Sequence, residues 1–260
     1  MNILIRADSS SYIGTGHIMR DLVLAKQYKN ENIIFATQDL VGNINHKIEE
    51  ENYKIELLKS NGFEELNKLV KKFEIDMIVI DSYDIDYNFE KKLKEDNSSL
   101  KIFVLDDTYE KHFCDILLNH NIYADEKKYQ NRVPKNCELR CGAKYTLLRD
   151  EFLEAKKAKN RVNKKNKTIF LGLGGADHKN LNIKILKVVE KFKKSLKVNL
   201  VTTTANKNLE ELKEYCKDKK WINLQINSNE VAKLMSKSDF AIVTPSVTAN
   251  EIFYLDLPMI

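Results

Sequence analysis

The start of the chain joins an apolar strand to a glycine-containing loop and a helix. Residues 2–7 have the composition of a buried strand, and apolar residues recur at helical spacing from Ile18 onward. In the loop between them, Gly14 and Gly16 let backbone amides approach a ligand, and the following helix N-terminus favours negative charge. A strand that leads through such a loop into a helix constrains the fold more than any other feature of this sequence, because it is the opening unit of a parallel α/β sheet.

A histidine lies where this loop meets the helix. The positive end of the helix dipole disfavours the protonated form of His17. A neutral imidazole is what a general base near pH 7 requires. The glycine spacing is not the dinucleotide fingerprint, which needs a third glycine where this chain has Met19. Spacing alone therefore leaves two interpretations of His17 open, a catalytic base or a simple cap of the helix.

Composition narrows the class of protein. The chain has 260 residues, enough for two domains with a substantial core, and its hydrophobic fraction of 43% is that of a soluble globular protein. The formal net charge of +5 is mild, and basic residues are not interleaved with aromatic ones, so we expect an anionic small molecule rather than nucleic acid as the partner. Neither a signal peptide nor an apolar run long enough for a bilayer is visible, so we expect a cytoplasmic protein with no membrane partner.

The four cysteines do not form a metal motif. Cys137 and Cys141 are spaced C-x3-C, but no second pair completes a zinc site, which favours buried or bystander thiols. The remaining histidines have no spacing that suggests a metal. We therefore expect neither a metal nor a cofactor.

The first half of the chain alternates strands and helices, which predicts a parallel sheet with helices on both faces. Asp81, Asp106 and Asp107 end apolar strands, and ligands bind at the carboxyl edge of such a sheet. The stretch from 120 to 141 is expected to be irregular. The expected strands are 2–7, 32–37, 54–58, 77–81, 101–106 and 116–119, and the expected helices begin near Gly16, Gly42, Gly62, Ile85 and Asp150.

The second half repeats the architecture. A basic run separates the halves, which predicts an N-terminal Rossmann-like domain at 1–155, a linker at 156–166 and a C-terminal Rossmann-like domain at 167–260. We expect the two domains to face each other across a cleft. The expected strands are 167–173, 198–203, 222–226 and 240–244, and the expected helices are one from about 180 and those at 209–217, 229–237 and 247–255.

Two features of the second half point to a nucleotide. The amides at Gly174 and Gly175 could hold a diphosphate, although a tight turn without a ligand explains these glycines equally well. Glu251 lies in the first two turns of a helix that Ser246 can cap. Its carboxylate either complements the helix dipole or accepts hydrogen bonds from ribose hydroxyls. Residues 257–260 have the pattern of a starting strand, which we interpret as a truncated product or a short domain.

Motifs along almost the whole chain, taken together, resemble one family. Their order and spacing are those of the UDP-2,4-diacetamido-2,4,6-trideoxy-β-L-altropyranose hydrolases of bacterial pseudaminic acid biosynthesis. The matching segments are R-x-D-S-S-x-x-I-G-x-G-H-I-x-R at 6–20, and those at 21–28, 80–83, 106–107, 114–119, 140–142, 148–149, 174–177, 232–235, 246 and 250–251.

The resemblance implies a GT-B-like fold of two Rossmann-like domains and a metal-independent reaction. Water would replace the sugar acceptor of a glycosyltransferase, releasing UDP and free 2,4-diacetamido-2,4,6-trideoxy-L-altrose with inversion at the anomeric carbon. His17 aligns with the catalytic histidine of the family. The chain lacks the strand and helix that usually close the second domain of this family.

The resemblance and the residues together give an expected site. His17 is the base; Glu251 holds the ribose, and Asn229 lies where uracil is expected. Ser246 adds a phosphate contact, while Asp8, Asp81 and Tyr83 contact the sugar or orient His17. The complete set of expected substrate-binding residues is Asp8, Gly14, Gly16, Arg20, Asp81, Tyr83, Arg149, Gly174, Gly175, Asn229, Ser246, Asn250 and Glu251.

Two other functions remain as alternatives. A GT-B glycosyltransferase would use the same UDP-sugar, but the chain has no amphipathic basic-aromatic insertion for docking on a lipid acceptor. A non-catalytic UDP-sugar binding protein would gain thermal stability from UDP and release nothing. Release of UDP without an acceptor distinguishes the hydrolase from both. We expect the protein to be a monomer.

Overall fold

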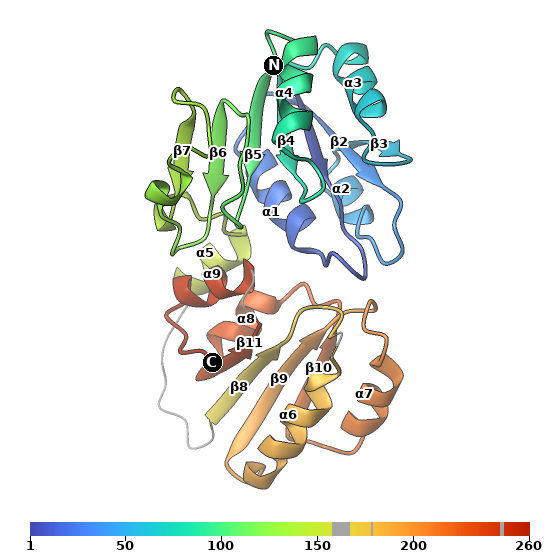
Figure 1. Ribbon diagram of the computed structural model, residues 1–260. Coiled ribbons are helices and arrows are strands. Elements are labelled where there is room, and N and C mark those ends of the chain that lie inside the picture. The colour runs from blue at the N-terminus through green and yellow to red at the C-terminus, as the bar shows by residue number, and fades with distance from the viewer. Residues whose placement is uncertain (158–166, 178, 245–246) are drawn as a thin grey trace. The chain divides into compact units, whose positions relative to one another are not determined.

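The computed structural model describes residues 1–157, 167–177, 179–244 and 247–260, which divide into two compact units (Figure 1). Unit 1 is Met1–Leu147 and unit 2 is Leu148–Ile260. The division falls ahead of the expected boundary at 155/156, because helix α5 (Asp150–Lys157) packs on helices of unit 2. Most of the expected linker at 156–166 lies outside the described residues.

Unit 1 is built on a parallel sheet of seven strands in the order β3-β2-β1-β4-β5-β6-β7. The strand order reverses between β1 and β4, and crevices at such a point bind ligands in open α/β sheets. The strands are β1 (Asn2–Ala7), β2 (Asn32–Gln38), β3 (Lys54–Leu58), β4 (Met77–Asp81), β5 (Lys101–Leu105), β6 (Ile116–Asn119) and β7 (Glu138–Cys141).

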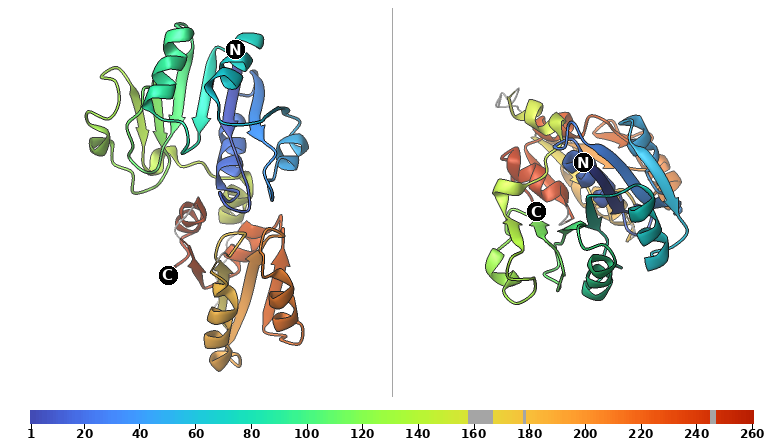
Figure 2. Two further views of the ribbon diagram at one scale, coloured as in Figure 1. Left: turned by 45° about the vertical axis from the view of Figure 1, so that its right-hand side comes forward. Right: turned by 90° about the horizontal axis from the view of Figure 1, so that it is seen from above.

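Helices cover both faces of this sheet (Figure 2). Helices α1 (Gly16–Ala25) and α2 (His46–Glu50) pack on one face, and α3 (Phe63–Lys72) and α4 (Tyr87–Asp96) pack on the other. Strand β4 is buried along its whole length, which explains its uninterrupted apolar sequence before Asp81. Two short 3₁₀ helices, Glu126–Tyr129 and Ala143–Tyr145, flank β7.

Strand β7 corrects the expectation of an irregular stretch up to 141. Its four residues pair in parallel with all of β6, from Ile116↔Glu138 to Asn119↔Cys141. Glu138 and Arg140 pair with each other through a 2.8 Å contact between Nε and Oε1, so the strand carries charge at an edge instead of an apolar run. Residues 138–141 form a strand because their backbone pairs with β6, and the pattern of apolar residues does not predict such pairing. Helices α2 and α4 also begin later than Gly42 and Ile85, at His46 and Tyr87.

Unit 2 repeats the architecture with a parallel sheet in the order β10-β9-β8-β11. Helices α6 and α7 pack on one face and α5, α8 and α9 on the other. The strands are β8 (Lys167–Gly172), β9 (Leu196–Thr202), β10 (Ile222–Ile226) and β11 (Phe240–Val243). The helices are α6 (Leu181–Val189), α7 (Leu209–Cys216), α8 (Val231–Ser236) and α9 (Val247–Tyr254), with a 3₁₀ turn at Glu190–Phe192.

The last residues of the chain pair with β11. The amide of Ala241 donates to the carbonyl of Pro258 at 2.8 Å, and that of Ile260 donates to the carbonyl of Ala241 at 2.9 Å. This parallel pairing agrees with the strand-like pattern expected at 257–260. Each unit is therefore a Rossmann-like parallel sheet, as the sequence predicts.

Candidate active site

The point of strand-order reversal in unit 1 brings the first loop of the chain beside the end of β4. The loop closes on itself, since Ser10 and Gly14 exchange two backbone hydrogen bonds and the Ser10 hydroxyl accepts the amides of Tyr12 and Ile13. Gly14 has a φ of +89°, a backbone conformation that residues other than glycine rarely adopt. The glycine thus shapes the loop that delivers the chain to the first residue of α1, Gly16.

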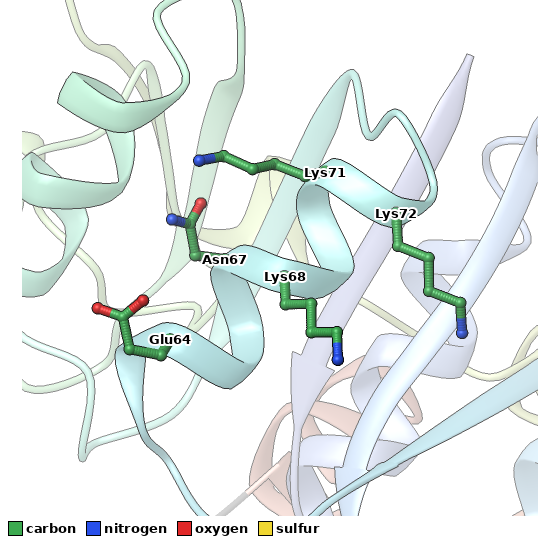
Figure 3. Close-up of a pocket in the computed structure, with 5 residues that line it drawn as sticks. All are labelled: Glu64, Asn67, Lys68, Lys71 and Lys72. Atoms are coloured by element: carbon green, nitrogen blue, oxygen red, sulfur yellow. The ribbon is translucent and has the colours of Figure 1, made fainter.

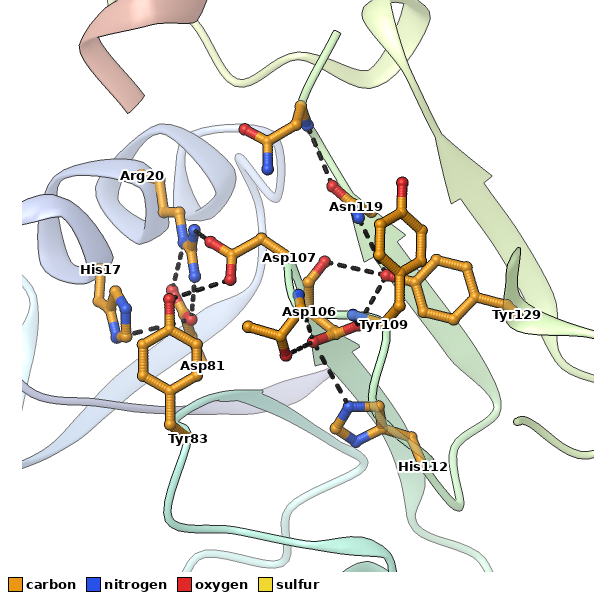
Figure 4. A network of polar contacts seen from close by, with 12 residues as sticks. His17, Arg20, Asp81, Tyr83, Asp106, Asp107, Tyr109, His112, Asn119 and Tyr129 are labelled. Atoms are coloured by element: carbon orange, nitrogen blue, oxygen red, sulfur yellow. Dashed lines mark hydrogen bonds and ion pairs between the residues drawn. The ribbon is translucent and has the colours of Figure 1, made fainter. Parts of the chain in front are cut away.

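Three charged side chains form a buried ion-pair network at this edge (Figure 4). Arg20 donates from Nε to Asp81 Oδ2 at 2.6 Å and from Nη2 to Asp81 Oδ1 at 2.5 Å. Its Nη1 donates to Asp107 Oδ2 at 3.0 Å. Burial alone would raise the pKa of Asp81, but the attraction of Arg20 and of His17 outweighs it, so the pKa lies below its ordinary value. Asp81 is therefore a carboxylate.

His17 lies beside this carboxylate. Its Nδ1 is 3.7 Å from Asp81 Oδ1, which is an electrostatic contact rather than a hydrogen bond. The ring of Tyr83 meets the imidazole edge to face with centroids 5.0 Å apart, and its hydroxyl donates to Asp107 Oδ1 at 2.9 Å. Burial and the charge of Asp107 raise the pKa of Tyr83, so its hydroxyl keeps its proton. The arrangement can orient an imidazole and stabilise the imidazolium that forms when the ring accepts a proton.

A second polar network lies next to the first and supports its strand ends (Figure 4). Asp106 accepts the hydroxyls of Tyr129 at 2.7 Å and Thr108 at 2.6 Å. His112 Nδ1 is 2.7 Å from Glu90 Oε1, and its Nε2 is 3.9 Å from Asp106 Oδ1. Burial opposes the charge of His112, but these two carboxylates outweigh it and raise its pKa to about 9. This network holds the segment after β5, which also carries Asp107.

The carboxylate of Asp8 is hydrogen-bonded to residues of β1 and β2. Its carboxylate accepts Arg6 Nη2 at 2.5 Å, the Gln38 amide at 2.7 Å and Gln38 Nε2 at 2.8 Å. Arg6 is fully buried beneath it. Burial would raise the pKa of Asp8, but the Arg6 guanidinium and the hydrogen bonds lower it on balance. The structure thus shows Asp8 joining β1 to β2, and no hydrogen bond from it to His17 appears among the contacts of the described residues.

Three residues outside the expected site belong to this edge. Asp107 is the second partner of Arg20, and its position after β5 is the signal that indicates it. Asp21 and His120 are fully buried, and neither side chain has a hydrogen-bond partner within the described residues. Burial and the nearby charge of Arg20 lower the pKa of His120 to about 4, so its ring is neutral. Asp21 follows Arg20 in a helix and carries no separate sequence signal.

In unit 2 the glycine loop follows β8 at the corresponding reversal of strand order. Gly174 has φ +72°, and a side chain at Gly175 would lie 2.6 Å from Thr203 Oγ1. The carboxylate of Asp177 accepts the amides of Leu181 and Asn182 at 2.9 Å each, and so occupies the N-terminus of α6. A phosphate group would therefore meet the amides of the loop rather than those two amides of α6.

Glu251, the residue that is expected to bind the ribose, pairs with an arginine of the same unit. Arg149 Nε donates to Glu251 Oε1 at 2.8 Å, and Arg149 Nη1 lies 2.6 Å from Glu151 Oε1. Glu251 is buried, and burial raises its pKa although Arg149 opposes the shift. Asn250 is buried beside it in α9, whereas Asn229 is exposed just before α8. Ser246 lies outside the described residues.

A hollow over α3 is unrelated to these residues. Its five lining side chains all extend from this one helix (Figure 3), and they are Glu64, Asn67, Lys68, Lys71 and Lys72. Glu64 and the three lysines are exposed, whereas Asn67 is buried with Leu66, Leu69 and Val70.

In the part of the chain that the structure describes, no three His, Cys, Asp or Glu side chains are grouped so as to hold a metal ion. Within the same residues, no helix is both long and apolar enough to cross a bilayer. The four cysteines are free thiols, and the Sγ atoms of Cys114 and Cys137 lie 3.6 Å apart.

Sequence comparison finds similar proteins among characterised and uncharacterised relatives. No family model matches the chain. It is 40% identical to the UDP-2,4-diacetamido-2,4,6-trideoxy-β-L-altropyranose hydrolase of Campylobacter jejuni over 255 residues, which is 98% of this chain and 89% of that protein. It is 30% identical to the uncharacterized protein MJ1062 of Methanocaldococcus jannaschii, covering 55% of that protein, and 24% identical to the spore coat polysaccharide biosynthesis protein SpsG of Bacillus subtilis, covering 76%.

Solved structures share the fold at low sequence identity. Arabidopsis thaliana UGT89C1, in complex with UDP, matches all of this chain and 78% of its own, with a TM-score of 0.65 and 11% identity. Acinetobacter baumannii MurG matches 98% of this chain and 76% of its own, with a TM-score of 0.55 and 13% identity. These matches agree with the GT-B-like architecture expected from the sequence.

Proposed function

This chain belongs to the family of UDP-2,4-diacetamido-2,4,6-trideoxy-β-L-altropyranose hydrolases, and we propose that His17 is the general base of its reaction. The enzyme hydrolyses a UDP-sugar and releases UDP, in a step of pseudaminic acid biosynthesis. The observation that carries the proposal for His17 is its position, with Nδ1 3.7 Å from the buried carboxylate of Asp81.

The chemistry asks for one base. UDP is a good leaving group, because its phosphate needs no proton to depart, so the acid carboxylate of a glycosidase is unnecessary. His17 would accept a proton from water as the water attacks the anomeric carbon, and Asp81 would stabilise the imidazolium that forms. A single displacement inverts the configuration at that carbon. The ring of Tyr83 contacts the imidazole, and Asp107 pairs with both the Tyr83 hydroxyl and the Arg20 guanidinium.

Residues of unit 2 would bind the nucleotide. Amides of the loop at Gly174 and Gly175 would stabilise the charge that grows on the departing diphosphate. Glu251, held by Arg149, would accept hydrogen bonds from the ribose hydroxyls, and Asn229, just before α8, would contact the uracil. Ser246 would add a phosphate contact, and Asn250 would also bind the substrate.

The experiment that tests the function follows the anomeric carbon by NMR. The purified chain is incubated with the UDP-sugar, without added metal or acceptor. We expect free sugar of inverted anomeric configuration together with UDP. Bound UDP without release would instead indicate an acceptor-dependent glycosyltransferase or a binding protein.

Replacing His17 tests its role as the base. We expect His17→Asn to lower kcat by at least about a hundredfold, since general-base catalysis contributes about 10²–10⁴. The affinity for UDP should stay nearly unchanged, as measured by calorimetry. His46→Asn, at an exposed histidine of the same unit, is the matched control. Loss of UDP binding and turnover together would contradict the proposed role.

A further inference from the structure

The buried face of α1 carries three polar residues, His17, Arg20 and Asp21, at the spacing of one helical turn. Asp21 is 0% exposed, and neither of its carboxyl oxygens has a hydrogen-bond partner among the described residues. Its neighbour Arg20 does not donate a hydrogen bond to Asp21, since all three guanidinium nitrogens donate to Asp81 or Asp107. An ionised carboxylate without a partner is too costly for such a buried position.

Asp21 also shares its surroundings with a second carboxyl group. Asp81 is near enough for its charge to act on Asp21, and among the described residues Arg20 is the cation that lowers the pKa of Asp21. Two carboxyl groups in one buried site do not both ionise readily, and the one without the bidentate arginine retains the proton. The core cluster that packs on α1 from β1, β2, β4 and β5 is apolar, and an apolar environment raises the cost of an ionised side chain.

We propose that Asp21 remains a neutral carboxylic acid in the folded enzyme and in this way sets the charge next to His17. Asp21 then acts only by staying uncharged beside Asp81, and this role rests on the proposed function of His17. With Asp21 neutral, Arg20, Asp81 and Asp107 carry one net negative charge, which balances the imidazolium once His17 accepts its proton. A second negative charge, on an ionised Asp21, would favour the protonated form of His17 in the free enzyme, and a protonated ring cannot accept a proton from water. Burial and the charge of Asp81 raise the pKa of Asp21, in agreement with the geometry.

Infrared spectroscopy tests the protonation state without substrate. We expect the wild-type protein near pH 7 to show a C=O stretching band of a protonated carboxylic acid that shifts in D₂O and disappears in Asp21→Asn. Glu90→Gln, which alters another buried carboxyl group of unit 1, should leave that band in place. If Asp21→Asn instead removes a carboxylate band, the proposal is overturned.

The pH dependence of stability gives a second readout. A carboxyl group whose pKa is higher in the folded protein adds stability below its unfolded pKa and loses that contribution as pH rises through the folded pKa. The Tm of Asp21→Asn minus that of the wild type should therefore increase as pH rises above about 4. Asp8→Asn is the opposite control, since the folded pKa of Asp8 is lowered and its contribution is present at high pH. A Tm difference for Asp21→Asn that falls with pH, as for Asp8→Asn, would contradict the proposal.

The pH profile of kcat/KM then tests the link to His17. Asp107→Asn removes a negative charge from the network and should move the acid limb of the profile to lower pH. Asp21→Asn exchanges one neutral group for another and should leave that limb where it is. A shift of the limb by Asp21→Asn would show that Asp21 is charged in the enzyme. If no variant and no wild-type protein hydrolyses the UDP-sugar, the proposed function fails, while the infrared and stability results still decide the state of Asp21.

Discussion

At the scale of single residues, two ion-pair networks in unit 1 give buried charged groups defined partners. Arg20 binds Asp81 in a bidentate pair, and His112 lies between Glu90 and Asp106. Removing one member of such a pair leaves the other charge buried and uncompensated, which costs about 3–5 kcal/mol. The networks therefore fix the strand ends on which the proposed base depends.

His112 makes the stability of unit 1 dependent on pH. Its folded pKa of about 9 is above the ordinary value of 6.5, so its contribution is complete below pH 6.5 and is lost as pH rises through 9. We expect His112→Asn to destabilise unit 1 by roughly 3 kcal/mol near pH 6, with a difference that narrows above pH 9. Unfolding at several pH values measures this, with His46→Asn as the exposed control. A difference that stays constant with pH would contradict a charged His112.

Glu251 allows a test of the ribose contact. We expect Glu251→Gln to weaken UDP binding by about 10- to 100-fold, since a hydrogen bond to a charged group contributes about 1.5–3 kcal/mol. The affinity for 2′,3′-dideoxy-UDP, which lacks both hydroxyls, should be nearly the same in Glu251→Gln as in the wild-type protein. Calorimetric titration measures both ligands, and Glu210→Gln on the exposed face of α7 is the control. An equal loss for the two ligands would assign Glu251 a structural role with Arg149 instead.

At the scale of elements, short loops at the carboxyl ends of strands decide the local geometry. The loop before α1 is closed by Ser10 and Gly14, and the loop after β8 packs against the end of β9. The carbonyl of Gly175 accepts the hydroxyls of Thr202 at 3.1 Å and Thr203 at 3.0 Å. A side chain at position 175 would crowd Thr203, so a glycine there favours this packing whether or not a diphosphate binds.

Adding a methyl group at Gly175 tests this packing. The new Cβ would lie 2.6 Å from Thr203 Oγ1 and 2.7 Å from its Cγ2, so we expect Gly175→Ala to destabilise unit 2 by about 1–3 kcal/mol. Combining it with Thr203→Ala should cost less than the sum of the two single changes. Gly14→Ala, where no atom lies within 4 Å of the added Cβ, isolates the cost of the positive φ. Calorimetry measures all four variants, and strict additivity would exclude the contact as the cause.

At the scale of the whole molecule, two units each have their own sheet and core. A ligand stabilises the folded unit that binds it in proportion to the logarithm of its concentration over Kd. Because the proposed UDP-binding residues belong to unit 2, a thermal scan reports on their assignment.

We expect UDP at about 100 times its Kd to stabilise unit 2 by about 2.7 kcal/mol. Differential scanning calorimetry should show the transition of unit 2 moving to higher temperature. Adenosine diphosphate at the same concentration is the control for non-specific anion binding. If UDP moves only the transition of unit 1, the assignment of the nucleotide residues to unit 2 is wrong.

The sequence by itself determined most of the elements, because buried parallel strands need apolar runs and their ends need turn residues. Strands β1, β3, β4, β6 and β10 have the expected bounds, and α1 begins at the expected Gly16. The order and spacing of motifs along almost the whole chain, taken together, indicated the family. The expected roles of individual residues toward the substrate, and the monomeric state, stay predictions.

Only the tertiary structure decided which side chains meet. Strand β7 exists because β6 offers it a backbone edge, and α5 belongs to unit 2 because its partners α8 and α9 are there. Packing between elements far apart in the sequence makes Asp107 the second partner of Arg20 and leaves Asp21 without a hydrogen-bond partner among the residues that the structure describes. Spacing along the chain reports local periodicity, whereas charge pairing and burial arise when the carboxyl ends of separate strands come together at one edge of a sheet.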